Sequence, residues 1–112
     1  MSISYEAIGQ VMVTCQAEQT VMEGHVVKMN GNDTVAPCAA GDIFCGVAGD
    51  VSEDGFAAVQ VKGFITVPCT DPTVAAGYMA LTADGNGGVK VADDGMKVLV
   101  MSVEDGNAVI CL

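Results

Sequence analysis

The sequence has no arginine and no tryptophan, and its 112 residues include only four lysines, two tyrosines, three phenylalanines and one histidine. Proteins that bind nucleic acids use Lys and Arg to displace counterions from phosphates, so this shortage of cations argues against nucleic acid as a partner. It argues against an anionic membrane surface for the same reason. Because His25 is the only histidine, a zinc site or a catalytic triad would lack its usual ligands.

Long apolar runs are also missing. The first six residues have no basic segment followed by an apolar one, so we expect no secretory signal. No stretch approaches the length of a membrane span. The cysteines are odd in number and widely scattered, so we expect free thiols in a reducing cytoplasm. They are Cys15, Cys38, Cys45, Cys69 and Cys111.

Acidic residues dominate the charge of the chain. Fourteen Asp and Glu against four Lys give a formal net charge of −10 at pH 7. Such a charge keeps a protein soluble at high concentration, and it also favours docking on a basic protein surface. The sequence leaves both interpretations open.

The composition is that of a β protein. Hydrophobic residues make up 51% of the chain, which is too many for a disordered segment. Many of them are valines, whose branched Cβ favours strands, and fourteen glycines supply turns. From Phe56 to Lys62, valines alternate with polar residues as in a half-buried strand. Gly63 then predicts a bend that lets the chain change sheets, and Pro68 predicts the end of pairing.

Turn signals divide the rest of the chain into short strands. Asn30-Gly31 predicts a type I′ hairpin from a strand over 21–29 into a strand over 34–36. Asp-Gly steps recur, because Asp caps a turn and Gly accepts positive φ. They lie at Asp54-Gly55, Asp84-Gly85, Asp94-Gly95 and Asp105-Gly106. Further strands are predicted over 43–48, 78–82, 88–91, 97–103 and 107–112.

We therefore predict an all-β fold, a small single-domain β-barrel or sandwich of short antiparallel strands with Asp-Gly and Asn-Gly turns. No segment leaves room for more than one helical turn.

No motif for catalysis or metal binding stands out. The paired carboxylates each precede a turn glycine, so turn formation explains them. We expect no enzymatic activity, no metal and no cofactor. One short segment, Val27-Lys28-Met29, resembles the biotin-carrier signature, in which a lysine lies between two methionines at a hairpin tip. Here a valine replaces the first methionine, and Lys28 precedes the turn instead of forming its apex.

The order of glycine turns and strands along residues 21–112 is the most informative pattern. It runs from Glu23-Gly24-His25-Val26-Val27 through Ala40-Gly41-Asp42-Ile43-Phe44-Cys45-Gly46-Val47-Ala48, the Gly63-centred double strand and Val74-Ala75-Ala76-Gly77 to Asp105-Gly106-Asn107-Ala108-Val109-Ile110. This order resembles the phage capsid cement, or head decoration, proteins. The stretch over 40–48 is its most specific part.

The resemblance implies a small β protein that binds the outside of a capsid, reinforces it and has no catalytic residues. Its partner would be the major capsid protein. Its place would be the capsid surface of the virion, after assembly in the host cytoplasm. We expect a homotrimer, because local threefold positions between capsomers present three equivalent sites.

Residues 1–14 precede the region of resemblance. We predict that they form an N-terminal arm or a first strand, with residues 15–112 as a single all-β domain. Apolar residues alternate loosely in this arm, and an exposed strand edge can pair with a partner, so we expect it to contact the capsid. The candidate contact residues are Ile3, Tyr5 and Ile8. Two other functions stay open, a biotinyl- or lipoyl-like carrier domain and a generic β interaction module.

Overall fold

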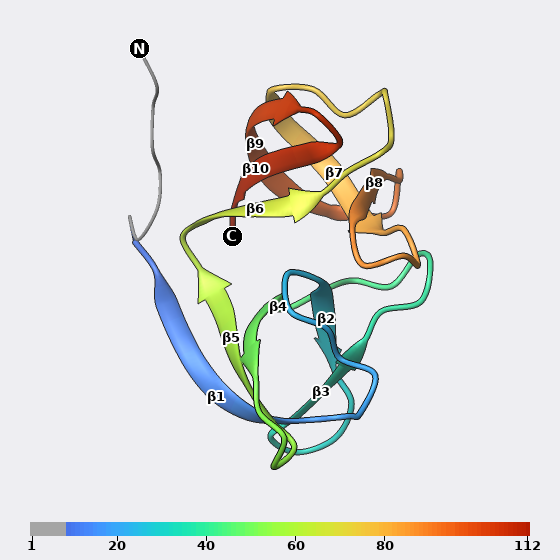
Figure 1. Ribbon diagram of the computed structural model, residues 1–112. Helices are drawn as coiled ribbons and strands as arrows, with labels where there is room; N and C mark the ends of the chain where they lie inside the picture. Colours follow the sequence, from blue (N-terminus) through green and yellow to red (C-terminus); the bar gives the residue numbers. More distant parts are fainter. Residues whose placement is uncertain (1–8) are drawn as a thin grey trace.

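Residues 9–112, the part of the chain that the computed structural model describes, form ten β-strands and no helix (Figure 1). The strands are β1 (Val11–Ala17), β2 (Val26–Met29), β3 (Thr34–Pro37), β4 (Gly46–Val51), β5 (Phe56–Lys62), β6 (Phe64–Pro68), β7 (Gly77–Ala83), β8 (Val89–Val91), β9 (Met96–Glu104) and β10 (Asn107–Cys111). The predicted all-β single domain is confirmed. Within this range there is accordingly no helix able to cross a membrane.

The first five strands close into a barrel in the order β1-β3-β2-β4-β5, and β5 pairs back with β1. All its pairings are antiparallel except the short contact between β1 and β3, where Gln16 lies beside Thr34 and Ala17 beside Val35. Strand directions cannot alternate all the way around a closed ring of five strands. Because the other four pairings are antiparallel, β3 has to run parallel to β1. The prediction of antiparallel strands therefore holds for every pair but this one.

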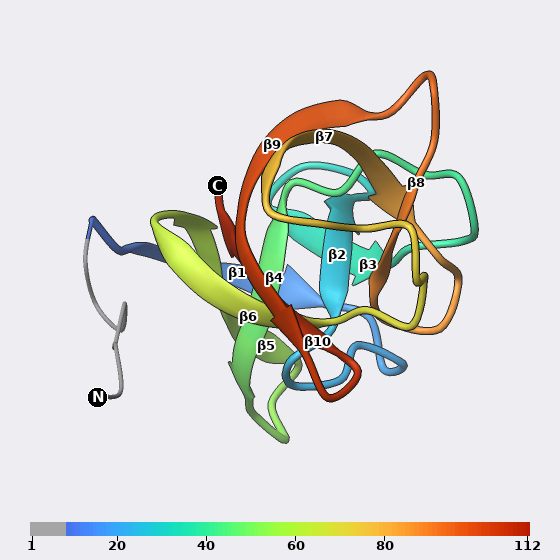
Figure 2. The same ribbon diagram turned by 90° about the horizontal axis from the view of Figure 1, so that it is seen from above.

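The other five strands form a second sheet in the order β6-β10-β9-β7-β8, with all neighbours antiparallel. Figure 1 shows this sheet above the barrel, and Figure 2 looks down on it, with the strands of the barrel behind. The fold thus combines the two predicted architectures, because a closed barrel packs against a separate sheet.

Gly63 carries the chain from the barrel to the second sheet. It lies between β5 and β6 with a φ of +99°. A Cβ at this position would approach backbone atoms of Gly9 and Gln10 to 2.8–2.9 Å. Glycine is therefore needed both for the positive φ and for the close passage of the two chain segments. The predicted bend and change of sheet at Gly63 are confirmed, and β6 ends at Pro68 as predicted.

Two apolar cores support the two layers. Small branched side chains fill the barrel, whereas the larger core lies between the barrel and the second sheet. The barrel core contains Val21, Val27, Val35, Ala48, Ala57 and Val59. In the larger core, Val26, Phe44 and Val47 meet side chains of the second sheet that include Leu81, Val98, Val100 and Ile110. Adjacent residues such as Val26 and Val27 serve different cores because side chains alternate along a strand.

Two strands begin later than the sequence predicts. The predicted strand over 21–29 is a strand only over Val26–Met29, because Gly24 adopts a φ of +85° and turns the chain. The predicted strand over 43–48 begins only at Gly46 and continues to Val51. Phe44, just before it, is 1% exposed and fills the core between the layers instead.

The predicted hairpin at Asn30-Gly31 exists, but its turn is not type I′. Positive φ values occur at Gly31 (+115°) and Asp33 (+57°) and not at Asn30, so the loop is wider than two residues. The type I′ pattern is found instead at Asp105-Gly106, with φ values of +52° and +80°, between the paired strands β9 and β10. Both hairpins follow from Asx-Gly chemistry, but the sequence does not distinguish the two turn types.

Thr82 offers a direct test of the core. Its side chain is fully buried, and its Oγ1 has no hydrogen-bond partner among the described residues. Because an unpaired buried hydroxyl costs free energy, we expect Thr82→Val to raise the free energy of unfolding by about 1 kcal/mol. Denaturant titration measures this change. Thr73→Val is the matched control and should lower stability, since the Thr73 Oγ1 donates to Asp71 Oδ1 at 2.6 Å. Equal stability of Thr82→Val and wild type would contradict the prediction.

Candidate functional site

The predicted contact residues Ile3, Tyr5 and Ile8 lie outside the described residues. The described part of the predicted arm begins at Gly9 and enters β1 at Val11. β1 runs on to Ala17, so the predicted boundary after residue 14 falls inside a single strand. Residues 11–14 therefore belong to the barrel. The described part of the predicted contact region is β1 and its neighbours.

Only one side of the first half of β1 is paired. Its partner β5 runs alongside from Val11 to Gln16, whereas β3 reaches only Gln16 and Ala17. The difference arises because β3 begins at Thr34, beside Gln16, and runs on past the end of β1. From Val11 to Cys15, the side of β1 that faces away from β5 is therefore an open edge.

The backbone groups at this open edge can be assigned from the hydrogen bonds at the end of β1. The Gln16 N–H donates toward β3, to Asp33 O at 2.7 Å, and the Ala17 N–H donates on the β5 side, to Gly55 O at 2.8 Å. Because these directions alternate along a strand, Met12 and Thr14 direct their N–H and C=O groups to the open edge. No other described residue pairs with these groups. They are free to accept an added strand.

The side chains at the same place are apolar and exposed. Val11, Met12 and Val13 are 47%, 43% and 41% exposed, which is high for three consecutive large hydrophobic residues in a strand. Natural edge strands are normally protected by charges, proline or bulges in the middle of the edge. Residues 12–15 contain no charge and no proline, and the one register shift lies at the outer end, between Val11 and Met12. This edge therefore lacks the usual protection against pairing with another strand.

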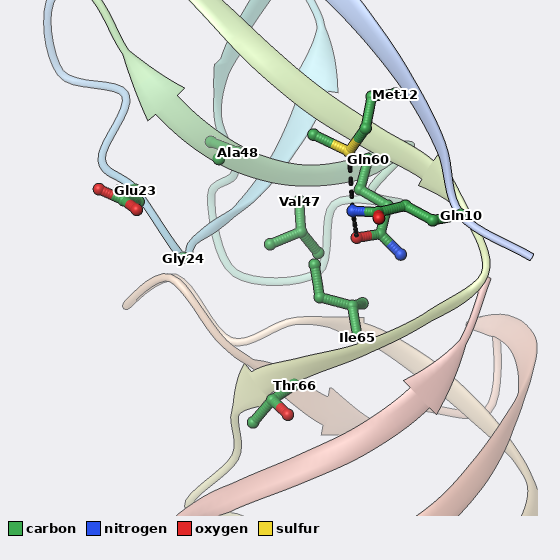
Figure 3. Close-up of a pocket in the computed structure, with 10 residues that line it drawn as sticks. Gln10, Met12, Glu23, Gly24, Val47, Ala48, Gln60, Ile65 and Thr66 are labelled. Carbon is green, nitrogen blue, oxygen red and sulfur yellow. Dashed lines mark hydrogen bonds between the residues drawn. The ribbon is translucent and has the colours of Figure 1, made fainter. Parts of the chain in front are cut away.

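A cleft of about 270 Å³ lies on the other side of β1 from the open edge, over Gln60 of β5 and Val47 of β4. Figure 3 shows Gln10 and Met12 on one side of it and Ile65 and Thr66 of β6 on another, with Val47 of β4 between them. The cleft is thus bounded by both layers, and Met12 belongs to the cleft as well as to the open edge.

Thr66 adds a backbone contribution to the cleft. The Leu112 N–H donates to Gly63 O and the Cys69 N–H donates to Gly106 O, each at 2.9 Å, so the odd-numbered residues of β6 face β10. Thr66 therefore directs its N–H and C=O away from β10, on the edge of β6. The cleft thus offers a polar backbone group beside apolar side chains, a combination that suits a peptide.

Gln60 fixes the geometry at the base of this region. Its side chain is 4% exposed, and its Nε2 donates to the carbonyl oxygens of Lys62 and Phe64, on either side of the bend, at 3.0 and 3.1 Å. Its Oε1 accepts a hydrogen bond of 3.1 Å from Nε2 of Gln10, which holds the start of β1 in place. The role of Gln60 was not predicted from the sequence. The only available signal was a polar residue three positions before the bend glycine.

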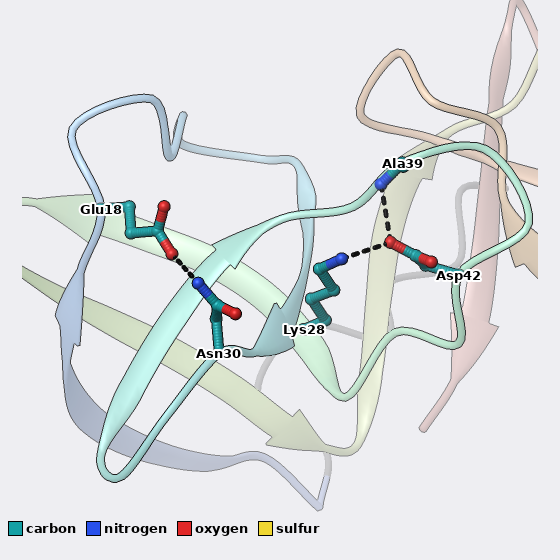
Figure 4. A network of polar contacts seen from close by, with 5 residues as sticks. All are labelled: Glu18, Lys28, Asn30, Ala39 and Asp42. Atoms are coloured by element: carbon teal, nitrogen blue, oxygen red, sulfur yellow. Dashed lines mark hydrogen bonds and ion pairs between the residues drawn. The ribbon is translucent and has the colours of Figure 1, made fainter.

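The structure also places Lys28, the residue at issue in the carrier alternative. Lys28 lies within β2 and not at a hairpin tip, and its Nζ is 2.7 Å from Asp42 Oδ2 (Figure 4). That hydrogen bond raises the pKa of Lys28 and lowers the pKa of Asp42, whose Oδ2 also accepts from the Ala39 N–H. Figure 4 shows a second polar contact nearby, from Asn30 to Glu18. The position of Lys28 within a strand and its pairing with Asp42 differ from those of a carrier lysine at a hairpin tip.

Three of the five cysteines have raised thiol pKa values. All five are free, as predicted. Burial raises the pKa of Cys38 to about 11, so its thiol stays neutral at pH 7 and is a poor nucleophile. Burial also raises the pKa values of Cys45 and Cys69. In residues 9–112, no three potential metal ligands from His, Cys, Asp and Glu lie together.

No protein-family model matches the chain, and no curated protein is significantly similar to it. The function is therefore inferred from the residues and fold of this chain.

Proposed function

We propose that this protein is a capsid decoration protein that binds the outer surface of a phage head, contacts the major capsid protein and stabilises the lattice as a homotrimer. The observation that carries the proposal is the open edge of β1. There, exposed apolar side chains coincide with unpaired backbone groups of Met12 and Thr14.

Strand addition explains how such an edge would hold a capsid. An extended segment of the major capsid protein hydrogen-bonds to Met12 and Thr14, which contributes affinity independently of sequence. Val11 and Val13 lose exposed apolar surface in the same step. Ile3, Tyr5 and Ile8 precede β1 directly in the sequence, so they extend the apolar contact toward the N-terminus.

Capsid stabilisation follows from mass action. A protein that binds the assembled shell and not the dissociated subunits shifts the equilibrium toward the shell. Individual contacts can be weak, because a trimer at a local threefold position engages three equivalent sites at once. The net charge of −10 keeps the free protein soluble and favours approach to a basic surface of the lattice.

A proline at the open edge tests this proposal. The N–H of Thr14 points away from β5, so Thr14→Pro removes one donor from the edge and leaves the pairing with β5 intact. We expect thermal unfolding close to that of wild type and binding to undecorated heads weakened by about tenfold, the effect of about 1.4 kcal/mol. Binding to the undecorated heads is measured by co-sedimentation.

Thr14→Ala is the matched control, since it shortens the same side chain but keeps the N–H. It should bind the heads like wild type. If Thr14→Pro and Thr14→Ala bind equally well, strand addition at this edge is wrong. If neither wild type nor Thr14→Ala binds heads at all, the protein is instead a generic β interaction module with another partner.

A further inference from the structure

A second apolar surface lies on the outer face of the second sheet. The register places Cys111 of β10 beside Leu99 of β9, and Leu99 beside Tyr78 of β7. Val98 and Val100, on either side of Leu99, are 3% and 1% exposed and belong to the core between the layers. Because side chains alternate along a strand, Cys111, Leu99 and Tyr78 form a row on the opposite face, away from the barrel. We call this row with its surroundings the outer face.

Tyr78 is the most prominent side chain of the outer face. It is 68% exposed, more than any other large hydrophobic residue in the described range. The Nζ of Lys97 lies 5.9 Å from the centre of its ring, a cation–π contact that restrains the ring on the sheet. Tyrosines presented rigidly on a surface are typical anchors of protein–protein contacts.

The backbone beside Tyr78 is also unpaired. β8 covers β7 only from Leu81 to Ala83, and the adjoining Ala92 N–H donates to Ala80 O at 3.0 Å. By alternation, Tyr78 directs its N–H and C=O to the same side as Ala80, away from β9. No described residue pairs with these groups. The exposed anchor therefore stands on an open strand edge.

The charge of the outer face differs from that of the whole chain. The strands of the second sheet contain two lysines, Lys90 and Lys97, and a single acidic residue, Glu104 at the end of β9. The other acidic residues of this half lie in the turns between strands. A strongly basic partner would favour the acidic turns, and nucleic acid would be repelled by the net charge of −10. A lysine-bearing apolar face complements a partner that is itself acidic.

We infer that the outer face is the surface through which this protein binds a second copy of itself. The acidic turns of a second copy can complement Lys97 locally, and the row of Cys111, Leu99 and Tyr78 supplies the apolar contact. The inference rests on the proposed function only for the trimeric state. It assigns self-association to β7, β9 and β10, and thereby leaves the open edge of β1 free for the capsid.

Sedimentation velocity over a wide concentration range tests the assignment. Tyr78→Glu adds a negative charge at an exposed position and should weaken self-association about 30-fold, the loss of a central aromatic anchor. Met29→Glu is the control, because Met29 is 51% exposed in β2 of the barrel and undergoes the same change of charge. It should associate like wild type.

Maleimide labelling of the native protein provides a second measurement. Cys111 should be protected in wild type at concentrations where it is assembled, and labelled faster in Tyr78→Glu at the same concentration. A monomeric wild type, or a Tyr78→Glu variant that associates normally with Cys111 still protected, overturns the inference. Head binding is scored separately. If a monomeric wild type binds heads, the proposed capsid function holds and the self-association through the outer face does not. If the protein self-associates through the outer face without binding heads, only the self-association holds.

Discussion

Gly63→Ala is expected to lower the free energy of unfolding by about 3 kcal/mol. Part of this loss comes from the φ of +99°, since an L-residue with positive φ costs about 1–2 kcal/mol. The remainder comes from the new Cβ, which would lie 2.8–2.9 Å from backbone atoms of Gly9 and Gln10. Such crowding costs about 1–3 kcal/mol, because backbone must move to relieve it.

Gly31→Ala separates the two contributions. Gly31 has a similar φ of +115°, but no atom lies within 4 Å of a Cβ built there. It should therefore lose only the conformational part, about 1–2 kcal/mol. Denaturant titration of the two variants and wild type gives the difference. Equal losses of unfolding free energy at Gly63 and Gly31 would contradict the prediction that crowding against residues 9–10 adds to the cost at Gly63.

Deletion of residues 1–8 is expected to weaken binding to undecorated heads by about 100-fold, or about 2.7 kcal/mol. The deletion removes Ile3, Tyr5 and Ile8, each able to contribute about 1.5–3 kcal/mol when fully buried in a contact. The entropic cost of association offsets part of that sum. The truncation spares Gln10, whose bond to Gln60 holds the start of β1, so thermal unfolding should stay close to that of wild type.

A full-length variant with Ile3→Ser, Tyr5→Ser and Ile8→Ser serves as the matched control. It keeps the backbone of the arm and removes only the apolar side chains. We expect it to bind heads as poorly as the truncated protein. If the triple variant binds like wild type, the side chains are not the contact, and if the truncation also binds like wild type, the arm has no role.

Local signals in the sequence were enough to predict the class of the fold and its most important bend. A valine-rich alternation interrupted by Gly63 is a local pattern, and the structure confirms both the strand pair and the change of sheet. Asx-Gly steps likewise marked turns between strands correctly, since a turn is a local feature, although Asp94-Gly95 joins β8 to β9, which do not pair with each other. Asp105-Gly106 even has the type I′ geometry that was predicted at Asn30-Gly31.

Features that depend on distant residues could not be predicted in this way. The parallel contact of β1 with β3 depends on which strands become neighbours in the barrel, and no local pattern encodes that choice. Gln60 could be assigned only once the bend had brought the carbonyls of Lys62 and Phe64 around its amide. The delayed start of β4 follows from Phe44, which is drawn into a core shared with the second sheet.

The candidate site was predicted in part. The sequence indicated a contact role for residues 1–14 because of their apolar alternation. The open edge itself results from the register of β3, which begins beside Gln16 of β1, and this register becomes evident only when the two strands lie side by side. The outer face was not predicted, because its row of Cys111, Leu99 and Tyr78 joins three strands through their register.

Co-sedimentation of the full-length protein with undecorated heads is the most direct test of the proposed function. We predict that the protein pellets with the heads, that the bound amount saturates, and that excess unlabelled protein displaces labelled protein from them. Protein that remains in the supernatant at every concentration of heads would contradict the assignment as a capsid decoration protein.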